Sequence, residues 1–145
     1  MFLIIEYIGT LMKKFFYYDP KLLLYGFSIL FFASYGQTFF ISLFNTEIRI
    51  FYDLSDGEFG LVYFIATLSS SLLLISFAKL IDHLDLRVYS FIITVGFLLA
   101  CLGMVLLINN ILYLFLIIFM LRFFGQGAMD HAGGTTMARY FGHDK

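Results

Sequence analysis

The composition and length of the sequence predict an all-α, polytopic transmembrane helix bundle. Of the 145 residues, 61% are hydrophobic, 21% are aromatic and only 13% are charged, and the mean hydropathy is +0.93. Soluble domains average about 45–50% apolar and about 25% charged residues, so this chain is too apolar for one small soluble globule. The same composition excludes intrinsic disorder, which requires low hydrophobicity and high net charge. At about 20 residues per span, the chain holds about four membrane-spanning helices.

The first two spans are uncharged stretches long enough to cross a bilayer. Residues 22–44 carry no formal charge and as a helix would measure about 34 Å, against a hydrocarbon core of about 30 Å. Residues 59–78 form a second uncharged stretch. The connection between them, residues 45–58, is charged and mixed in composition. Ser55 or Asp56 is expected to cap the second helix.

The third and fourth spans are predicted by dividing one uncharged run, residues 88–121. As a single helix this run would measure about 51 Å, which is more than tilting accommodates. Asn109-Asn110 interrupts the run, and asparagine favours turns. We therefore expect a third span over residues 88–108, a hairpin at the two asparagines and a fourth span over residues 111–133.

The distribution of basic residues predicts which ends of the spans face the cytoplasm. Cytoplasmic connections carry an excess of lysine and arginine. Arg49 alone lies in the two connections expected on the outer side. Residues 1–21 are accordingly the expected cytoplasmic lead-in, and both termini are expected in the cytoplasm. The basic residues on that side are Lys13, Lys14, Lys21, Lys79, Arg87, Arg139 and Lys145.

Arg122 is the residue that points most directly to a function. Eleven uncharged residues of the fourth span precede it, which places it near the middle of the bilayer. A cation at that depth costs roughly 2.5–3.5 kcal/mol on insertion scales and normally faces a bundle interior or a wet cavity. We expect it either to bind an anion in a transport pathway or to pair with a neighbouring helix and position it. None of the other three expected spans contains a carboxylate that could be its partner.

Polar residues of the first and fourth spans are the candidates for lining a substrate cavity. Gln126 lies about 40° around an α-helix from Arg122, so the two are expected to share one face. Tyr35 and Gln37 of the first span are polar at membrane depth, where polar groups require partners. They are expected either to line the cavity or to hydrogen-bond between helices. Asp130, two turns beyond Arg122, is not expected to neutralise it.

Glycines are concentrated in the fourth span, at Gly125, Gly127 and Gly133 among others. In membranes, small residues let helix backbones approach closely, and this packing role is the one expected of them. Alternatively, they permit a bend in the helix.

Several other classes of protein are excluded. Cys101 is the only cysteine, so there is no disulfide framework and no thiolate metal cluster. The three histidines have no second metal ligand at a suitable spacing, and neither a metal nor a cofactor is expected. The sequence contains no nucleophile elbow, P-loop or dinucleotide fingerprint, so an enzyme is not expected. A net charge of -1 gives no indication of a nucleic-acid partner.

Two stretches resemble signatures of the major facilitator superfamily. Between the second and third expected spans, AKLIDHLDLR resembles the superfamily's loop signature G-x-L-A-D-R-x-G-R-K. Leu80, Asp82 and Arg87 match this signature. The departures from it include Ala78, His83, Asp85 and Leu86. In the fourth span, the Arg-x-x-Gly-Gln-Gly spacing that begins at Arg122 is similar to the superfamily's fourth-helix motif. The resemblance covers about residues 22–141.

This resemblance implies a fold, a function and partners. Members have twelve helices in two six-helix halves and move small solutes by alternating access. Residues 22–145 would supply helices one to four of the first half, a fragment not competent alone, whose missing partners would be helices five to twelve. Arg122 would line the central cavity, while Leu80, Asp82 and Arg87 would belong to a cytoplasmic conformational latch. The implied location is multi-pass in a bacterial cytoplasmic (inner) membrane.

Two functions therefore stay open. One is a secondary active transporter, whose partners are the lipid bilayer and a small, anionic solute. The other is a self-contained four-helix membrane assembly or subunit protein, in which the mid-membrane arginine and the glycine face form a subunit interface. The nucleotide sequence after codon 145 separates them. A continuation that encodes further apolar spans favours the transporter, and a stop before unrelated sequence favours the subunit.

Overall fold

The computed structural model describes residues 20–106 and 108–141, which are helical or connect helices and contain no β-strand. Four stretches are long and apolar enough to cross a membrane, and we call them the first to fourth spans: Pro20–Ser42, Asp56–Asp82, Leu86–Leu106 and Ile111–Tyr140. The predicted all-helical, four-span class is confirmed. Most of the expected lead-in, residues 1–21, lies outside the described residues.

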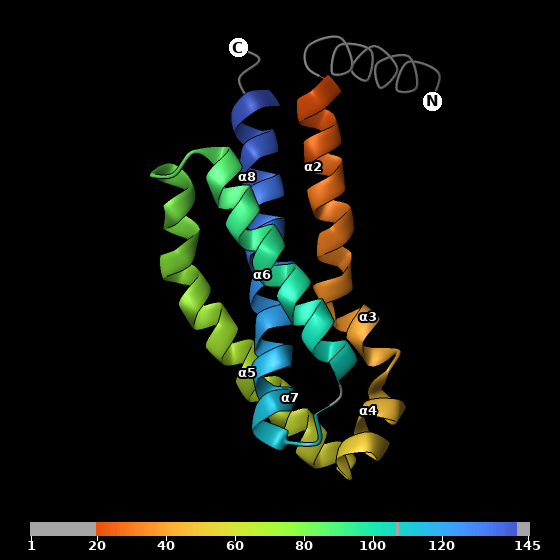
Figure 1. Cartoon of the computed structure of the whole chain (residues 1–145). Coiled ribbons are helices and arrows are strands. Elements are labelled where there is room, and N and C mark those ends of the chain that lie inside the picture. Colours follow the sequence, from red (N-terminus) through yellow and green to blue (C-terminus); the bar gives the residue numbers. More distant parts are fainter. Residues whose placement is uncertain (1–19, 107, 142–145) are drawn as a thin grey trace, which may run out of the picture.

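The helices form an elongated bundle whose spans run alternately up and down (Figure 1). The start of α2, the α5–α6 connection and the end of α8 lie at one end of the bundle, and α4 and the start of α7 lie at the other. The two ends of the described chain therefore share one side, and their cytoplasmic orientation stays a prediction. In chain order the elements are α2 (Pro20–Ala33), η1 (Ser34–Gly36), α3 (Thr38–Ser42), α4 (Asn45–Tyr52), α5 (Asp56–Phe77), η2 (Ala78–Asp82), α6 (Leu86–Leu106), α7 (Ile111–Met120), η3 (Leu121–Met129) and α8 (Asp130–Phe141).

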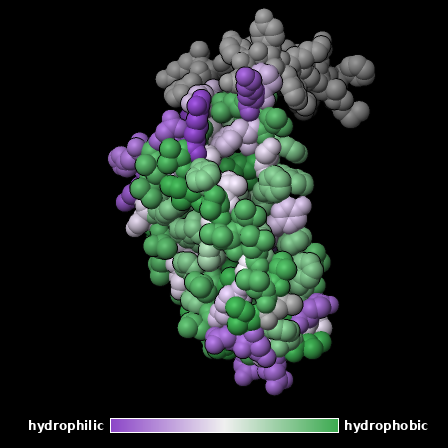
Figure 2. Space-filling model, in the orientation of Figure 1, coloured by the Kyte–Doolittle hydropathy of each residue, from purple (hydrophilic) through white to green (hydrophobic). Residues whose placement is uncertain are grey.

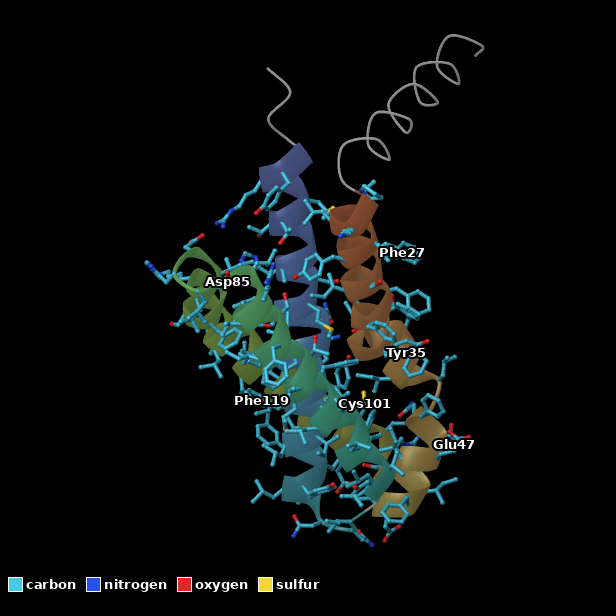
Figure 3. The ribbon with its side chains drawn as sticks, turned by 45° about the horizontal axis from the view of Figure 1, so that its top comes forward. Phe27, Tyr35, Glu47, Asp85, Cys101 and Phe119 are labelled. Atoms are coloured by element: carbon cyan, nitrogen blue, oxygen red, sulfur yellow. The ribbon has the colours of Figure 1, made fainter. Side chains whose placement is uncertain are left out.

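The surface of the bundle is apolar along most of its length. Figure 2 shows a broad hydrophobic band on one face, with hydrophilic residues gathered at both ends. Only 11% of the most apolar part of the second span is buried within the chain. Large side chains such as Phe27, which is 69% exposed, point away from the bundle (Figure 3). Soluble monomers rarely expose so large an apolar area, so this is the surface of a multi-pass integral membrane protein.

The first span is interrupted, whereas the sequence predicted one continuous helix over residues 22–44. A 3-10 turn, η1, follows α2, and Gln37 is extended (φ -75°, ψ 153°) before α3 begins. The stretch contains no proline that would break a helix. Instead, Gly36 is buried so closely against the fourth span that a β carbon there would lie 2.5 Å from the Leu121 carbonyl oxygen. We attribute the interruption to this approach of two backbones.

The connection between the first and second spans contains α4, a helix that the sequence analysis did not predict. Its eight residues place Ile48 in a small buried cluster, while Glu47 stays exposed. The helix ends at Tyr52, and the next residue, Asp53, adopts the left-handed conformation with φ 52°. Arg49 of α4 pairs with Asp56 at the start of α5. The charged composition that suggested a loop therefore belongs to an amphipathic helix at one end of the bundle.

Caps mark the starts of the second and fourth spans. The Ser55 backbone N–H donates to the Glu58 carboxylate at 2.8 Å, and the Glu58 N–H donates to the Ser55 hydroxyl at 3.3 Å. The Asn110 side-chain oxygen accepts from the N–H groups of Leu112 at 2.8 Å and Tyr113 at 3.2 Å. These bonds satisfy N–H groups that a helix start leaves without partners. Ser55 is confirmed as the cap, and the predicted break at the two asparagines is present.

Asn110→Ala is expected to destabilise the first turn of the fourth span by about 1 kcal/mol, the usual effect of removing a cap. The N–H groups of Leu112 and Tyr113 lose their acceptor, so their hydrogen exchange in detergent should become faster. Asn109→Ala is the matched control, because the Asn109 side chain makes no hydrogen bond within the described residues. Equal acceleration in both variants would contradict the capping role of Asn110.

The fourth span also departs from a single α-helix. It consists of α7, then η3, which is π-helical over nine residues, and then α8. π-Helical bonds join residues five apart, and such segments are rare and frequently lie at functional sites. η3 contains Arg122, Gly125, Gln126 and Gly127. The 100° spacing that placed Gln126 beside Arg122 therefore does not describe this segment.

Candidate functional site

Three consecutive residues of the first span contact two ionisable side chains of the fourth, Arg122 and Asp130. Arg122 Nη1 donates to Thr38 Oγ1 at 2.9 Å and to the Gly36 carbonyl oxygen at 3.4 Å. Gln37 Nε2 donates to Asp130 Oδ2 at 2.6 Å. We call these five residues the polar junction. It lies where the interruption of the first span meets the π-helical part of the fourth.

Arg122 is buried in the bundle with no carboxylate beside it. Its residue exposure is 8%, and no ion pair joins it to any acidic side chain within the described residues. Its guanidinium carbon lies 5.4 Å from the centroid of the Tyr63 ring, which is within cation–π range. The Tyr63 hydroxyl also donates to Thr38 Oγ1 at 3.0 Å. Arg122 Nε is buried and has no hydrogen-bond acceptor among the described residues.

A glycine pair lets the two spans come together at the polar junction. A β carbon on Gly36 would lie 2.8 Å from the Gly125 α carbon, and one on Gly125 would lie equally close to Gly36. A β carbon on Gly125 would also lie 2.7 Å from the Phe97 ring. A residue larger than glycine does not fit at Gly36 or Gly125, where the first and fourth spans cross. The resulting approach brings the Gly36 carbonyl within reach of Arg122.

The other two glycines predicted to serve packing lie against different neighbours. A β carbon on Gly127 would lie 3.0 Å from Leu74 of α5, and one on Gly133 would lie 2.7 Å from Leu30 of α2. By contrast, a β carbon on Gly134 would meet open space. Glycines of the fourth span thus lie at its contacts with both the first and the second spans.

The structure separates the four residues predicted to line a cavity. Arg122 and Gln37 belong to the polar junction. Gln126 lies beside it, since a β carbon on Gly36 would be 2.9 Å from the Gln126 backbone nitrogen, and its side-chain oxygen is buried without a partner. Tyr35 lies outside the polar junction. Its ring packs edge-on against the Phe40 ring, and the two ring centroids are 4.8 Å apart.

Tyr35 instead lines an apolar groove of about 1020 Å³ between the first span and α4 on one side and the third span on the other. Figure 3 shows three of its lining residues, Tyr35, Glu47 and Cys101, on the same side of the molecule. Neither Arg122 nor Gln37 is among the residues that line the groove. The groove is thus lined by none of the polar junction's residues, but it reaches Leu121 and Met129 of the fourth span, which are adjacent in sequence to Arg122 and Asp130.

Comparisons with known proteins assign no family. No family model, curated protein or solved structure matches the chain. The resemblance to the major facilitator superfamily consequently stays a prediction from its motifs. Within the described residues, no group of three or more His, Cys, Asp or Glu side chains could hold a metal ion.

The residues of the loop motif lie at the ends of the second and third spans. Asp82 pairs with Arg139 near the end of α8, and both side chains are half-exposed. Arg87 is exposed, and its backbone N–H donates to the Asp85 carboxylate at 2.8 Å. Leu80 is 37% exposed. The ion pair between Asp82 and Arg139 thus joins the loop to the fourth span, and this pairing was not predicted from the sequence.

Breaking the pair between Asp82 and Arg139 is expected to lower the free energy of unfolding by no more than about 1 kcal/mol, because exposed ion pairs are weak. The check is a double-mutant cycle with Asp82→Asn and Arg139→Gln, measured by denaturation in detergent at low and high salt. The coupling energy should fall as salt screens the pair. A coupling well above about 1 kcal/mol that salt does not change would contradict this.

Sequence reasoning missed Tyr63 and Asp130 as members of this region. From sequence, the partner expected for Arg122 is a carboxylate, whereas the structure supplies an aromatic face and neutral oxygens. Asp130 was considered only as a partner of Arg122, but it is bonded to an amide of the first span. The available signal was the pair of polar residues Gln37-Thr38 within a mostly apolar span.

Proposed function

We propose that the chain forms part of a secondary active transporter of the major facilitator superfamily. It would supply helices one to four of the first half and act in a bacterial cytoplasmic membrane, with both termini in the cytoplasm. The whole protein would move a small anionic solute by alternating access. The observation that carries this proposal is the polar junction. There a buried arginine of the fourth span, which has no carboxylate partner among the described residues, contacts the interruption of the first span.

Interrupted helices support a transport site for a physical reason. Backbone that departs from an α-helix at membrane depth is tolerated only where protein buries it or where it lines a water-filled cavity. Transporters typically form their midplane binding sites from such discontinuous helices. The first span is interrupted at Gln37, and the π-helical segment of the fourth span lies against it.

Arg122 supports an anionic solute. Its contacts in the chain are neutral, and its Nε is left without an acceptor. A carboxylate would supply that acceptor, since the planar guanidinium suits carboxylate oxygens. The pair between Asp82 and Arg139 would belong to the proposed cytoplasmic latch, with Leu80 and Arg87 beside it.

The test is uptake by cells that express the gene together with its own downstream sequence. Radiolabelled succinate and lactate serve as probes, in a host that lacks uptake of both, and an empty vector gives the background. Uptake above background that requires the gene is the expected result. If neither carboxylate enters the cells while the protein is present in their membranes, the proposed anionic solute is wrong.

A second candidate is a self-contained subunit of a homo-oligomer, and the apolar groove favours it because a helix of a second copy could cover it. Light scattering in mild detergent distinguishes the two. A complex with a multiple of the 16.8 kDa chain mass supports the subunit. A single copy under conditions that preserve the helical content counts against it.

A further inference from the structure

A carboxyl group lies within the fourth span, and its hydrogen bond comes from an amide. Asp130 Oδ2 accepts from Gln37 Nε2 at 2.6 Å, and no cation pairs with it among the described residues. Ionisable residues within membrane spans are costly and mark ion pathways and proton relays. We propose that Asp130 is a proton-binding site whose protonation changes the contacts of the polar junction. The inference deepens the proposed function and rests on it for one point, the identity of the coupling ion as a proton.

The titratable groups near Asp130 leave its carboxyl without a charged partner. Its helix, α8, packs against α2 and η3. Arg122 bonds to Gly36 and Thr38, and Arg139 bonds to Asp82. The Tyr25 hydroxyl bonds to the Ser90 hydroxyl at 2.6 Å. The titratable side chains of α2, η1, η3 and α8 are Lys21, Tyr25, Tyr35, Arg122, Asp130, His131, Arg139 and Tyr140. Within the described part of the chain, no hydrogen bond or ion pair joins Tyr25, Tyr35, Arg122, His131, Arg139 or Tyr140 to Asp130.

The polar junction connects Asp130 to Arg122 through adjacent residues of the first span. Gln37 donates to Asp130, and Thr38, the next residue, accepts from Arg122. Gln37 is extended between η1 and α3, and its backbone bonds to both: its N–H donates to the Ser34 carbonyl oxygen at 3.2 Å, and its carbonyl oxygen accepts from the Ile41 N–H at 3.2 Å. Thr38, the first residue of α3, directly follows it. A displacement of Gln37 therefore moves Thr38 relative to Arg122.

Protonation changes the strength of the bond that Gln37 makes. With the carboxyl ionised, the bond from Gln37 is charge-assisted and roughly twice as strong as a neutral one. When Asp130 takes a proton from water, the bond becomes neutral and holds the interruption of the first span less firmly. The contact between Thr38 and Arg122 then loosens, although Asp130 and Arg122 do not touch. Release of the proton restores the original contacts.

Two measurements on the purified chain in lipid nanodiscs test this inference. Infrared difference spectra between about pH 8 and about pH 5 should show a protonated carboxyl band that Asp130→Asn removes. Asp53→Asn is the matched control, because Asp53 is exposed outside the spans and its left-handed backbone suits asparagine. The band should survive in this control.

The second measurement is hydrogen exchange of backbone amides in residues 34–44, corrected for the intrinsic effect of pH. Exchange should be faster at the lower pH in the native chain, and this difference should vanish in Asp130→Asn, whose amide oxygen can still accept from Gln37. Gln37→Leu should keep the carboxyl band but lose the effect of pH on exchange. The same pH effect in the native chain and in Asp130→Asn would overturn the inference.

The outcomes separate this inference from the proposed function. If the protein shows the Asp130 carboxyl band and pH-dependent exchange at the polar junction but transports no solute, the proton-binding site is supported and the proposed transporter is wrong. Uptake that is intact and independent of a proton gradient, with no band from Asp130, would overturn the proton site and leave the transporter.

Discussion

Replacing Gly36 with alanine is expected to lower the free energy of unfolding by about 1–3 kcal/mol, and replacing it with leucine should lower it further. The added β carbon would lie 2.5 Å from the Leu121 carbonyl oxygen, 2.8 Å from the Gly125 α carbon and 2.9 Å from the Gln126 nitrogen. All three are backbone atoms, so no flexible side chain can move aside. The first and fourth spans must separate, and Arg122 loses its contacts with the first span. Loss of helical circular dichroism during denaturation in detergent measures the effect.

Gly60→Ala and Gly134→Ala are the matched controls for this result. Each lies within a helix, and a β carbon at either position would meet open space. Alanine favours a helix over glycine by up to about 1 kcal/mol, so both variants should be neutral or slightly more stable. A loss of stability at Gly60 or Gly134 as large as that at Gly36 would show that the crossing of the two spans is not the cause.

Replacing Arg122 with alanine is expected to abolish carboxylate uptake by the transporter proposed above, while membrane insertion is retained. The variant removes the buried cation that the solute would require. Insertion should become easier, because a charge at that depth costs roughly 2.5–3.5 kcal/mol on insertion scales. Arg122→Lys should also fail, since an ammonium group cannot reproduce a planar guanidinium held by Thr38 and Gly36 while stacked near Tyr63. Uptake and the amount of protein in the membrane are measured on the same cells.

Arg49→Ala is the control for this loss of uptake. Arg49 lies in α4 and pairs with Asp56 at an end of the bundle, away from the polar junction. Its removal should leave uptake close to the native value. Native uptake by the Arg122→Ala variant would remove Arg122 from the mechanism.

The sequence predicts the features of the fold that depend on composition or on a few adjacent residues. Long uncharged stretches must cross the membrane as helices because nothing else satisfies their backbone groups there. Ser55 and the asparagine pair act within one turn, so their caps could be recognised locally. These signals were sufficient for the four spans and for the break before Ile111.

The features that were missed depend on contacts between distant residues. The interruption near Gln37 and the π-helical segment around Arg122 arise where two backbones meet, and no local residue in either stretch dictates the departure from an α-helix. The bond between Gln37 and Asp130 joins residues 93 positions apart. A helical wheel also assumes one regular helix, an assumption that fails at the segment where the candidate site lies.

The polar junction has a consequence for how the protein enters the membrane during synthesis. The fourth span carries Arg122 and Asp130, each costly at membrane depth. The neutral groups to which they hydrogen-bond, Gly36, Gln37 and Thr38, all belong to the first span. The ribosome makes those partners first, so they are already in the bilayer when the fourth span leaves the translocon. Insertion of the fourth span is therefore favoured when the first is still beside it, and the first span acts as a chaperone within the same chain.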